Sequence, residues 1–165
     1  MPAVDLLIVI PFYNEERHLK NTVTELLKRL PDSERLHITL VDSGSTDQSP
    51  RIAEECAEQY DRVTLTQSHV SLNPSAARNR GVAFGPSASF LSFIDADSLV
   101  TDSWASALTD LISEQNRADR LFITGDTVDV SLNPTPLELA WFQPLQSAKK
   151  SYMNSGNLIT TTRTF

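Results

Sequence analysis

Two aspartates, Asp95 and Asp97, stand one residue apart directly after an apolar run at residues 90–94. The run is rich in aromatic and aliphatic residues, which predicts a buried strand that ends where the carboxylates begin. Two carboxylates at one strand end repel each other unless a cation lies between them. Mg²⁺ binds one or two protein carboxylates and completes its shell with water and phosphate oxygens. The pair therefore indicates a divalent metal that holds a diphosphate, with an acidic turn that binds nothing as the alternative.

Two more polar clusters follow predicted strands. They comprise Pro11, Tyr13 and Glu15 after the apolar residues 6–10, and Asp42 with residues 43–45 after the strand predicted at 36–41. In parallel sheets, ligands bind outside the carboxyl ends of the strands. Because the three clusters would meet at that edge, their convergence is more informative than any one motif.

Apolar periodicity predicts the elements that position these clusters. Strands are expected at 6–10, 36–41, 63–66, 90–94, 122–130 and 157–162, and helices at 14–30, 49–60, 75–83 and 102–112. Asn14 is the predicted cap of the first helix, and residues 134–150 have no clear pattern beyond a helical piece at 137–142. Alternation of strands and helices predicts an α/β fold with a mostly parallel sheet and helices on both faces.

Single residues in the clusters allow more than one role. Asp42 could accept a hydrogen bond from a nucleobase or ribose, or could bond to its own backbone in an Asx-turn. Tyr13 could stack on a base or pack against the sheet edge, and Glu15 could contact a ligand or match the helix dipole. Arg78 and Arg80 are two apart on a predicted helix and point in different directions, so one could face a phosphate or base while the other is solvated, or both could be surface arginines.

Composition limits the function classes. The 165 residues fit one domain, and 40% hydrophobic with 21% charged residues is typical of a soluble globular protein. A net charge of −7 argues against nucleic-acid binding, which usually needs a basic face. The single cysteine, Cys56, is predicted to be a small core residue in a reducing compartment. No apolar stretch approaches the roughly 18–20 residues of a membrane span, and no signal peptide is visible.

Four ordered motifs resemble the family-2 glycosyltransferases of GT-A fold. They are residues 11–16 (Pro-Phe-Tyr-Asn-Glu-Glu), 41–47 (Val-Asp-Ser-Gly-Ser-Thr-Asp), 77–81 (Ala-Arg-Asn-Arg-Gly) and 93–98 (Phe-Ile-Asp-Ala-Asp-Ser). Residues 155–158 (Ser-Gly-Asn-Leu), followed by a Thr-Arg pair at 162–163, look like the family's later strand. The order and spacing match the family across most of the chain.

The resemblance implies transfer of a sugar from a nucleotide-diphosphate donor to a carbohydrate or lipid-linked acceptor, with inversion. It implies a nucleotide-sugar site formed by Pro11, Tyr13, Glu15, Asp42, Arg78, Asp95, Ala96 and Asp97. Within it, Asp95 and Asp97 would form the D-x-D motif that holds Mg²⁺ or Mn²⁺, with Asp97 the more direct ligand. A metal stabilises the charge on a departing nucleoside diphosphate, and inversion needs a general base at the acceptor.

The chain departs from the family pattern in two places. Ser71 and Asn73 stand where the family often has Asn-x-Gly, and Asn73 is expected to tolerate a left-handed conformation there. The family's base is an aspartate in an acidic pair after the last strand, whereas Glu138 is the only carboxylate after Asp129 here. Asp126 and Asp129 are weak substitutes, so no catalytic residue is assigned.

Residues 1–165 are therefore expected to form one GT-A nucleotide-sugar-binding domain that holds the donor site, with the acceptor half beyond the C-terminus. The fragment alone would then be inactive. Two alternatives remain: a nucleotidyltransferase, which would bind a nucleoside triphosphate, and a non-catalytic nucleotide-sugar-binding module. The expected location is the cytoplasm, either free or at the inner face of the membrane, with membrane association only through segments outside this sequence.

Overall fold

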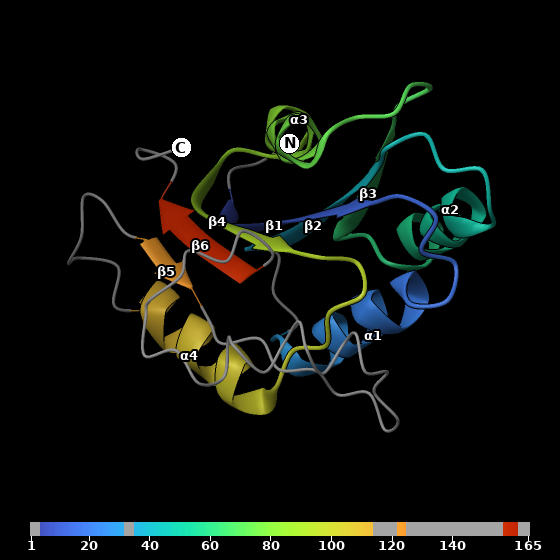
Figure 1. The fold of residues 1–165 in the computed structure, drawn as a ribbon. Coiled ribbons are helices and arrows are strands. Elements are labelled where there is room, and N and C mark those ends of the chain that lie inside the picture. The colour runs from blue at the N-terminus through green and yellow to red at the C-terminus, as the bar shows by residue number, and fades with distance from the viewer. Residues whose placement is uncertain (1–3, 32–34, 114–121, 125–156, 162–165) are drawn as a thin grey trace, which may run out of the picture.

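The computed structural model describes residues 4–31, 35–113, 122–124 and 157–161 (Figure 1). Strands and helices alternate along them: β1 Val4–Phe12, α1 Leu19–Arg29, β2 Leu36–Asp42, α2 Ser49–Gln59, β3 Val63–Gln67, α3 Pro74–Phe84, β4 Ala88–Ile94, α4 Asp102–Ser113, β5 Phe122–Thr124 and β6 Asn157–Thr161. This alternation confirms the predicted α/β class. The remainder of the strand predicted at 122–130 and the helical piece at 137–142 lie outside the described residues.

The strands form one six-stranded sheet in the order β3-β2-β1-β4-β6-β5. Strands β3, β2, β1 and β4 are parallel, whereas β6 runs antiparallel to both β4 and β5. The register places Phe12 beside Asp42 and Val9 beside Phe93. The carboxyl ends of β1, β2 and β4 therefore meet at one edge, as the mostly parallel sheet of the prediction requires.

Helices cover both faces of the sheet, with α3 on one face and α1, α2 and α4 on the other (Figure 1). Alternate residues of β1 account for the two layers. Leu6 and Ile8 belong to the core cluster that includes α1, whereas Leu7 and Val9 pack in a second cluster with Ala77 of α3. Side chains alternate across a strand, so a central strand covered on both faces must be apolar throughout.

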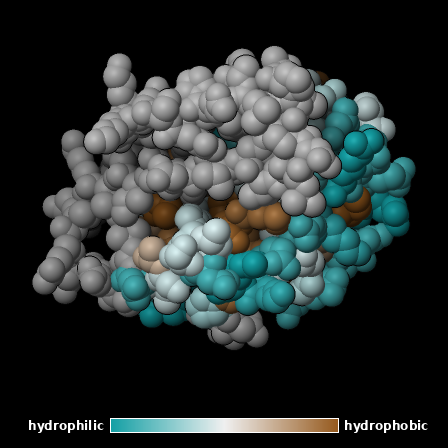
Figure 2. Space-filling view, turned by 60° about the horizontal axis from the view of Figure 1, so that its bottom comes forward, coloured by the Kyte–Doolittle hydropathy of each residue, from teal (hydrophilic) through white to brown (hydrophobic). Residues whose placement is uncertain are grey.

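The surface of the described residues is mainly polar. On the side of α1 and α4, hydrophilic residues cover much of the visible described surface, and apolar residues gather near its centre (Figure 2). The large apolar side chains that the described part exposes are Tyr13, Val70, Phe84 and Leu99, whereas Cys56 is buried as predicted. No helix within the described residues is both long and apolar enough to span a bilayer.

Helix α1 begins elsewhere than predicted, whereas helix α4 does not. Helix α1 begins at Leu19 rather than at Asn14, which instead adopts a left-handed conformation with φ of 55°. Helix α4 begins at Asp102, as predicted, and Oγ1 of Thr101 before it accepts a hydrogen bond from the Trp104 N–H (3.2 Å). The difference at α1 arises because the Asn14 segment is held by tertiary contacts to the loop after β2 instead of capping a helix.

Helix α3 also begins differently. Asn73 has extended backbone, with φ of −71°, and its Oδ1 accepts a hydrogen bond from the Ala76 N–H (2.8 Å). The left-handed conformation predicted for Asn73 is therefore wrong, because the residue is the N-cap of α3. This cap fixes the start of the helix that carries Arg78 and Arg80.

Gly81 lets α3 approach the sheet closely. A Cβ atom added to Gly81 would overlap Cγ1 of Val9 and lie 2.9 Å from Cγ2 of Val41. Both valines are fully buried in the central strands. Because β-branched side chains have few alternative rotamers, neither can move aside easily.

We therefore expect Gly81→Ala to lower the free energy of unfolding by about 1–3 kcal/mol, the usual cost of overpacking a core. This loss would appear despite the better helix propensity of alanine. Urea denaturation measures it. Ser75→Ala, at an exposed position of the same helix, is the control and should change stability little; equal stability of both variants would contradict the close packing.

Candidate functional site

The loops that follow β1 and β2 are joined by hydrogen bonds from one loop's backbone to the other's side chains. The Asn14 N–H donates to Oγ of Ser45 (3.0 Å), and Oδ1 of Asn14 accepts from the Thr46 N–H (2.8 Å). The left-handed backbone of Asn14 is a conformation that asparagine tolerates better than most residues. This exchange holds the Tyr13 segment against the loop after Asp42.

A second set of hydrogen bonds extends the same contact. The Glu15 N–H donates to Oγ of Ser49 (2.7 Å), and the Glu16 N–H donates to Oδ2 of Asp47 (3.1 Å). Oε2 of Glu16 in turn accepts from the Gln48 N–H (3.0 Å). Burial alone would raise the pKa of the Asp47 carboxyl, but the hydrogen bonds that it accepts from Ser49 and from the Glu16 N–H lower this pKa below its usual value. We call these bonds, together with those of Asn14, the loop clamp.

Asp42 is buried at the end of β2 and takes part in its own turn. Its Oδ1 accepts a hydrogen bond from the Ser45 N–H (2.9 Å), as in an Asx-turn. Gly44 within the turn has φ of 82°, a conformation that favours glycine. The structure therefore gives Asp42 the turn contact that the sequence left open, while its predicted contact with a nucleoside stays a prediction.

A cavity of about 460 Å³ lies at the carboxyl ends of β1 and β4. Its lining includes seven of the eight predicted site residues, the exception being Asp42: Pro11, Tyr13, Glu15, Arg78, Asp95, Ala96 and Asp97. Sequence reasoning did not assign the other five to the site: Phe12, Ser43, Leu72, Pro74 and Ala77. Ser43 could have been found, because it directly follows Asp42 at the same sheet edge.

Arg78 and Asp95 form an ion pair inside this cavity, with 3.0 Å between Nη2 and Oδ1. The Arg78 side chain is only 13% exposed, and its buried Nε has no hydrogen-bond partner in the described part of the chain. Burial raises the pKa of the Asp95 carboxyl, the Arg78 guanidinium opposes that rise, and the nearby charge of Asp97 adds to it. The pair thus leaves carboxylate charge at the strand end only partly compensated.

The two carboxylates fit a divalent cation that also has other ligands. Asp95 and Asp97 line the same cavity, and a turn bond from the Ser98 N–H to the Asp95 carbonyl (3.0 Å) holds the segment that bears them. No group of three or more His, Cys, Asp or Glu residues within the described ranges could enclose a metal. Mg²⁺ and Mn²⁺ accept such an open site, because water and phosphate oxygens can complete the shell.

Arg80 lies outside the cavity lining and binds the edge strand instead. Its Nε donates to Oγ1 of Thr66 (3.1 Å), its Nη2 donates to the Gln67 carbonyl (2.7 Å), and its guanidinium lies 4.6 Å from the centre of the Phe84 ring. The predicted divergence of Arg78 and Arg80 is confirmed. Arg80 is bound to the sheet and not solvated as the sequence suggested.

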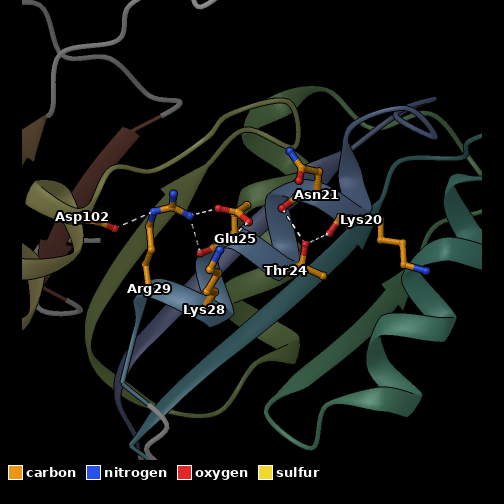
Figure 3. A network of polar contacts seen from close by, with 7 residues as sticks. All are labelled: Lys20, Asn21, Thr24, Glu25, Lys28, Arg29 and Asp102. Atoms are coloured by element: carbon orange, nitrogen blue, oxygen red, sulfur yellow. Dashed lines mark hydrogen bonds and ion pairs between the residues drawn. The ribbon is translucent and has the colours of Figure 1, made fainter.

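A second hollow, of about 560 Å³, lies between α1 and α4 and shares no lining residue with the first. Arg29 crosses it, pairing with Glu25 on its own helix and with Asp102 of α4 (3.0 Å between Nε and Oδ1; Figure 3). The Arg29 guanidinium is thus paired with a carboxylate on each of the two helices. None of the polar clusters predicted from the sequence reaches this hollow.

Comparison with known proteins now gives the family. The chain matches the family described as Glycosyl transferase family 2 over residues 7–162. The chain belongs to this family. Its relatives include EpsJ of Bacillus subtilis (strain 168), which is 33% identical over 114 residues, or 68% of this chain and 31% of EpsJ. GlyG of Streptococcus pneumoniae serotype 4 is 27% identical over 109 residues, or 66% of this chain and 35% of GlyG.

Solved structures share the fold of this family 2 chain. S. aureus TarS 1-349 in complex with UDP-GlcNAc has a TM-score of 0.65 at 20% identity, with 80% of this chain and 37% of that chain covered. A mannosyltransferase from Pyrobaculum calidifontis, in complex with GDP-Man and Mn²⁺, has a TM-score of 0.55 at 23% identity, with 62% and 31% covered. The expected GT-A fold is confirmed. The chain spans well under half the length of each of these relatives.

The loop clamp gives a testable expectation for the family 2 chain. Ser49 is fully buried, and its hydroxyl oxygen accepts the Glu15 N–H. Ser49→Ala removes the acceptor and leaves that partly buried N–H unpaired, so we expect the free energy of unfolding to fall by about 1–3 kcal/mol. Chemical denaturation measures the change. The exposed Ser106 of α4 provides the control Ser106→Ala, and similar behaviour of the two variants would argue against the clamp.

Proposed function

We propose that this chain binds a nucleotide-diphosphate sugar together with Mg²⁺ or Mn²⁺, as the donor site of an inverting glycosyltransferase. The observation that carries the proposal is the cavity at the ends of β1 and β4, where Arg78, Asp95 and Asp97 meet. Family membership supports the reaction class. The relatives solved with GDP-Man and Mn²⁺ and with UDP-GlcNAc support the ligand class.

Different residues of the cavity are proposed to bind different parts of the donor. Tyr13 is 52% exposed beside the cavity and can stack on a base. Arg78 presents a buried guanidinium that can donate to phosphate oxygens. Asp97, exposed at the cavity edge, can ligate a cation with Asp95. When bound, that cation would offset the negative charge of the leaving nucleoside diphosphate.

The acceptor side is proposed to involve other parts of the protein. Inversion needs a general base that deprotonates the acceptor hydroxyl. The carboxylates considered from the sequence, Asp126, Asp129 and Glu138, lie outside the described residues. We propose a carbohydrate or lipid-linked acceptor and assign no base; the donor-site-only role, the cytoplasmic location and any association with the inner membrane face are part of the same proposal.

Ligand-induced stabilisation tests donor binding. A ligand at 100 times its dissociation constant adds about 2.7 kcal/mol to the stability of the folded state. For a domain of this size we expect the melting temperature to rise by about 5–10 °C with UDP or GDP in the presence of Mn²⁺, and by less with EDTA. Absence of a shift with either nucleotide and its sugars would contradict the proposal.

The same panel separates the two alternatives. A nucleotidyltransferase would respond to a nucleoside triphosphate in place of nucleotide sugars and would release pyrophosphate. A non-catalytic module would bind the sugar nucleotide, yet the whole protein would show no acceptor-dependent transfer. Each of these results would therefore overturn the proposal in favour of one named alternative.

Asp97→Asn tests the metal site. The substitution keeps the shape of the side chain and removes its charge, so we expect Mn²⁺-dependent nucleotide binding to be lost while circular dichroism stays unchanged. Isothermal titration calorimetry with and without Mn²⁺ gives the comparison. Asp61→Asn, at an exposed position before β3, is the charge-matched control. Unchanged metal-dependent affinity in Asp97→Asn would show that the cation site is wrongly placed.

A further inference from the structure

A buried hydroxyl of α1 contacts the turn that carries the two aspartates. Thr22 is 1% exposed, and its Oγ1 donates a hydrogen bond of 2.7 Å to the carbonyl of Ala96, 74 residues later in the chain. Ala96, itself buried, stands between Asp95 and Asp97. The contact therefore joins the first helix to the centre of the Asp-Ala-Asp segment.

The surroundings of Thr22 are apolar. Leu19, Val23 and Leu26, on the same helix, are buried members of the core that packs against the sheet. A valine would have nearly the same shape in this position and no hydroxyl to bury. A buried hydroxyl is costly unless it is hydrogen-bonded, and so is a buried carbonyl. The Thr22 hydroxyl and the Ala96 carbonyl satisfy each other's hydrogen-bonding capacity. The hydroxyl therefore stabilises the aspartate turn and adds nothing to the apolar packing of the helix.

The bond restricts the direction of the Asp97 side chain. The Ala96 carbonyl belongs to the planar peptide that links Ala96 to Asp97. Fixing that carbonyl limits ψ of Ala96 and φ of Asp97, and hence the direction in which the Asp97 Cβ leaves the backbone. On the other side of the turn, the Ser98 N–H binds the Asp95 carbonyl (3.0 Å). The two bonds together hold both carboxylates on a turn with little freedom.

Helix α1 also connects this turn to the nucleoside side of the cavity. The Leu19 N–H donates to the Glu15 carbonyl (3.0 Å), so the helix begins directly after the segment that the loop clamp holds. Thr22 lies one turn further along, where its hydroxyl reaches Ala96. One rigid helix therefore sets the position of the Tyr13–Glu15 loop relative to the aspartate turn.

We propose that Thr22 is a positioning residue for the divalent-cation site, acting through the Ala96 carbonyl on the orientation of Asp97. This inference rests on the proposed function, because it requires a cation at Asp95 and Asp97. Groups behind a metal's ligands orient them, and their loss typically weakens metal binding about 10–100-fold. Mg²⁺ and similar ions need near-ideal ligand geometry, which makes a misdirected carboxylate costly.

The test compares Thr22→Val, which keeps the shape without the hydroxyl, with Thr22→Ser, which keeps the hydroxyl. The probe is Mn²⁺ titrated against each protein in the presence of UDP and, separately, GDP, followed by the electron paramagnetic resonance signal of free Mn²⁺. We expect Thr22→Val to weaken Mn²⁺ binding about 10–100-fold and Thr22→Ser to retain near-parental binding. Thr24→Val is the control, because the Thr24 hydroxyl bonds to the Lys20 and Asn21 carbonyls of its own helix turn (Figure 3).

The outcomes separate the two proposals. If the parent chain shows no Mn²⁺-dependent nucleotide binding, the proposed function and this inference fail together. If the parent binds and Thr22→Val binds Mn²⁺ equally well, only the role of Thr22 is overturned, even where its melting temperature has fallen. If Thr22→Val does not fold, Thr22→Ala replaces it, and parental Mn²⁺ affinity in that variant would overturn the inference. Weaker Mn²⁺ binding by Thr22→Val together with near-parental Mn²⁺ binding by Thr22→Ser supports the inference.

Discussion

Parallel pairing of β1 with β2 and with β4 is the constraint on which the candidate site depends. The register sets Phe12 beside Asp42 and Val9 beside Phe93, so three loops leave the sheet at one edge. Parallel strands need a crossover between them, and the helices α1, α2 and α3 supply those crossovers. The site thus combines residues separated by more than 80 positions in sequence, between Pro11 and Asp95, without any long loop.

The residues that resemble the family motifs serve two different purposes. Arg78 and Asp95 line the cavity and pair there, whereas the side chain of Asn14 binds a backbone N–H of the neighbouring loop. Arg80, two residues from Arg78, joins α3 to β3. The motif at 11–16 therefore contains both residues that line the cavity, Tyr13 and Glu15, and a residue that holds its loop in place, Asn14. Not every residue of a short polar motif at a strand end needs to contact a ligand.

The sequence predicted the strands and the mostly parallel sheet well, because buried parallel strands are apolar on both faces and appear as apolar runs. It predicted helix starts less well. Asn14 has the side chain of a helix cap, yet it binds Thr46 from the neighbouring loop, a tertiary contact that no local pattern reveals. The bond from Thr22 to Ala96 was missed for the same reason, since a threonine on an apolar helix face gives no sequence signal of its distant partner. Asp42 was left open and adopts the local turn.

The charges of the residues that line the cavity affect how a diphosphate could bind there. Its lining holds three carboxylates, Glu15, Asp95 and Asp97, against the one guanidinium of Arg78. That guanidinium is already paired with Asp95, and the whole chain carries a net charge of −7. A diphosphate entering alone would bring more negative charge to a site whose carboxylates already outnumber its guanidinium. A divalent cation reverses that balance, because it attracts both the carboxylates and the phosphate oxygens. Under the proposed function, nucleotide binding by this cavity is therefore expected to depend on a cation, for electrostatic reasons that follow from the lining residues.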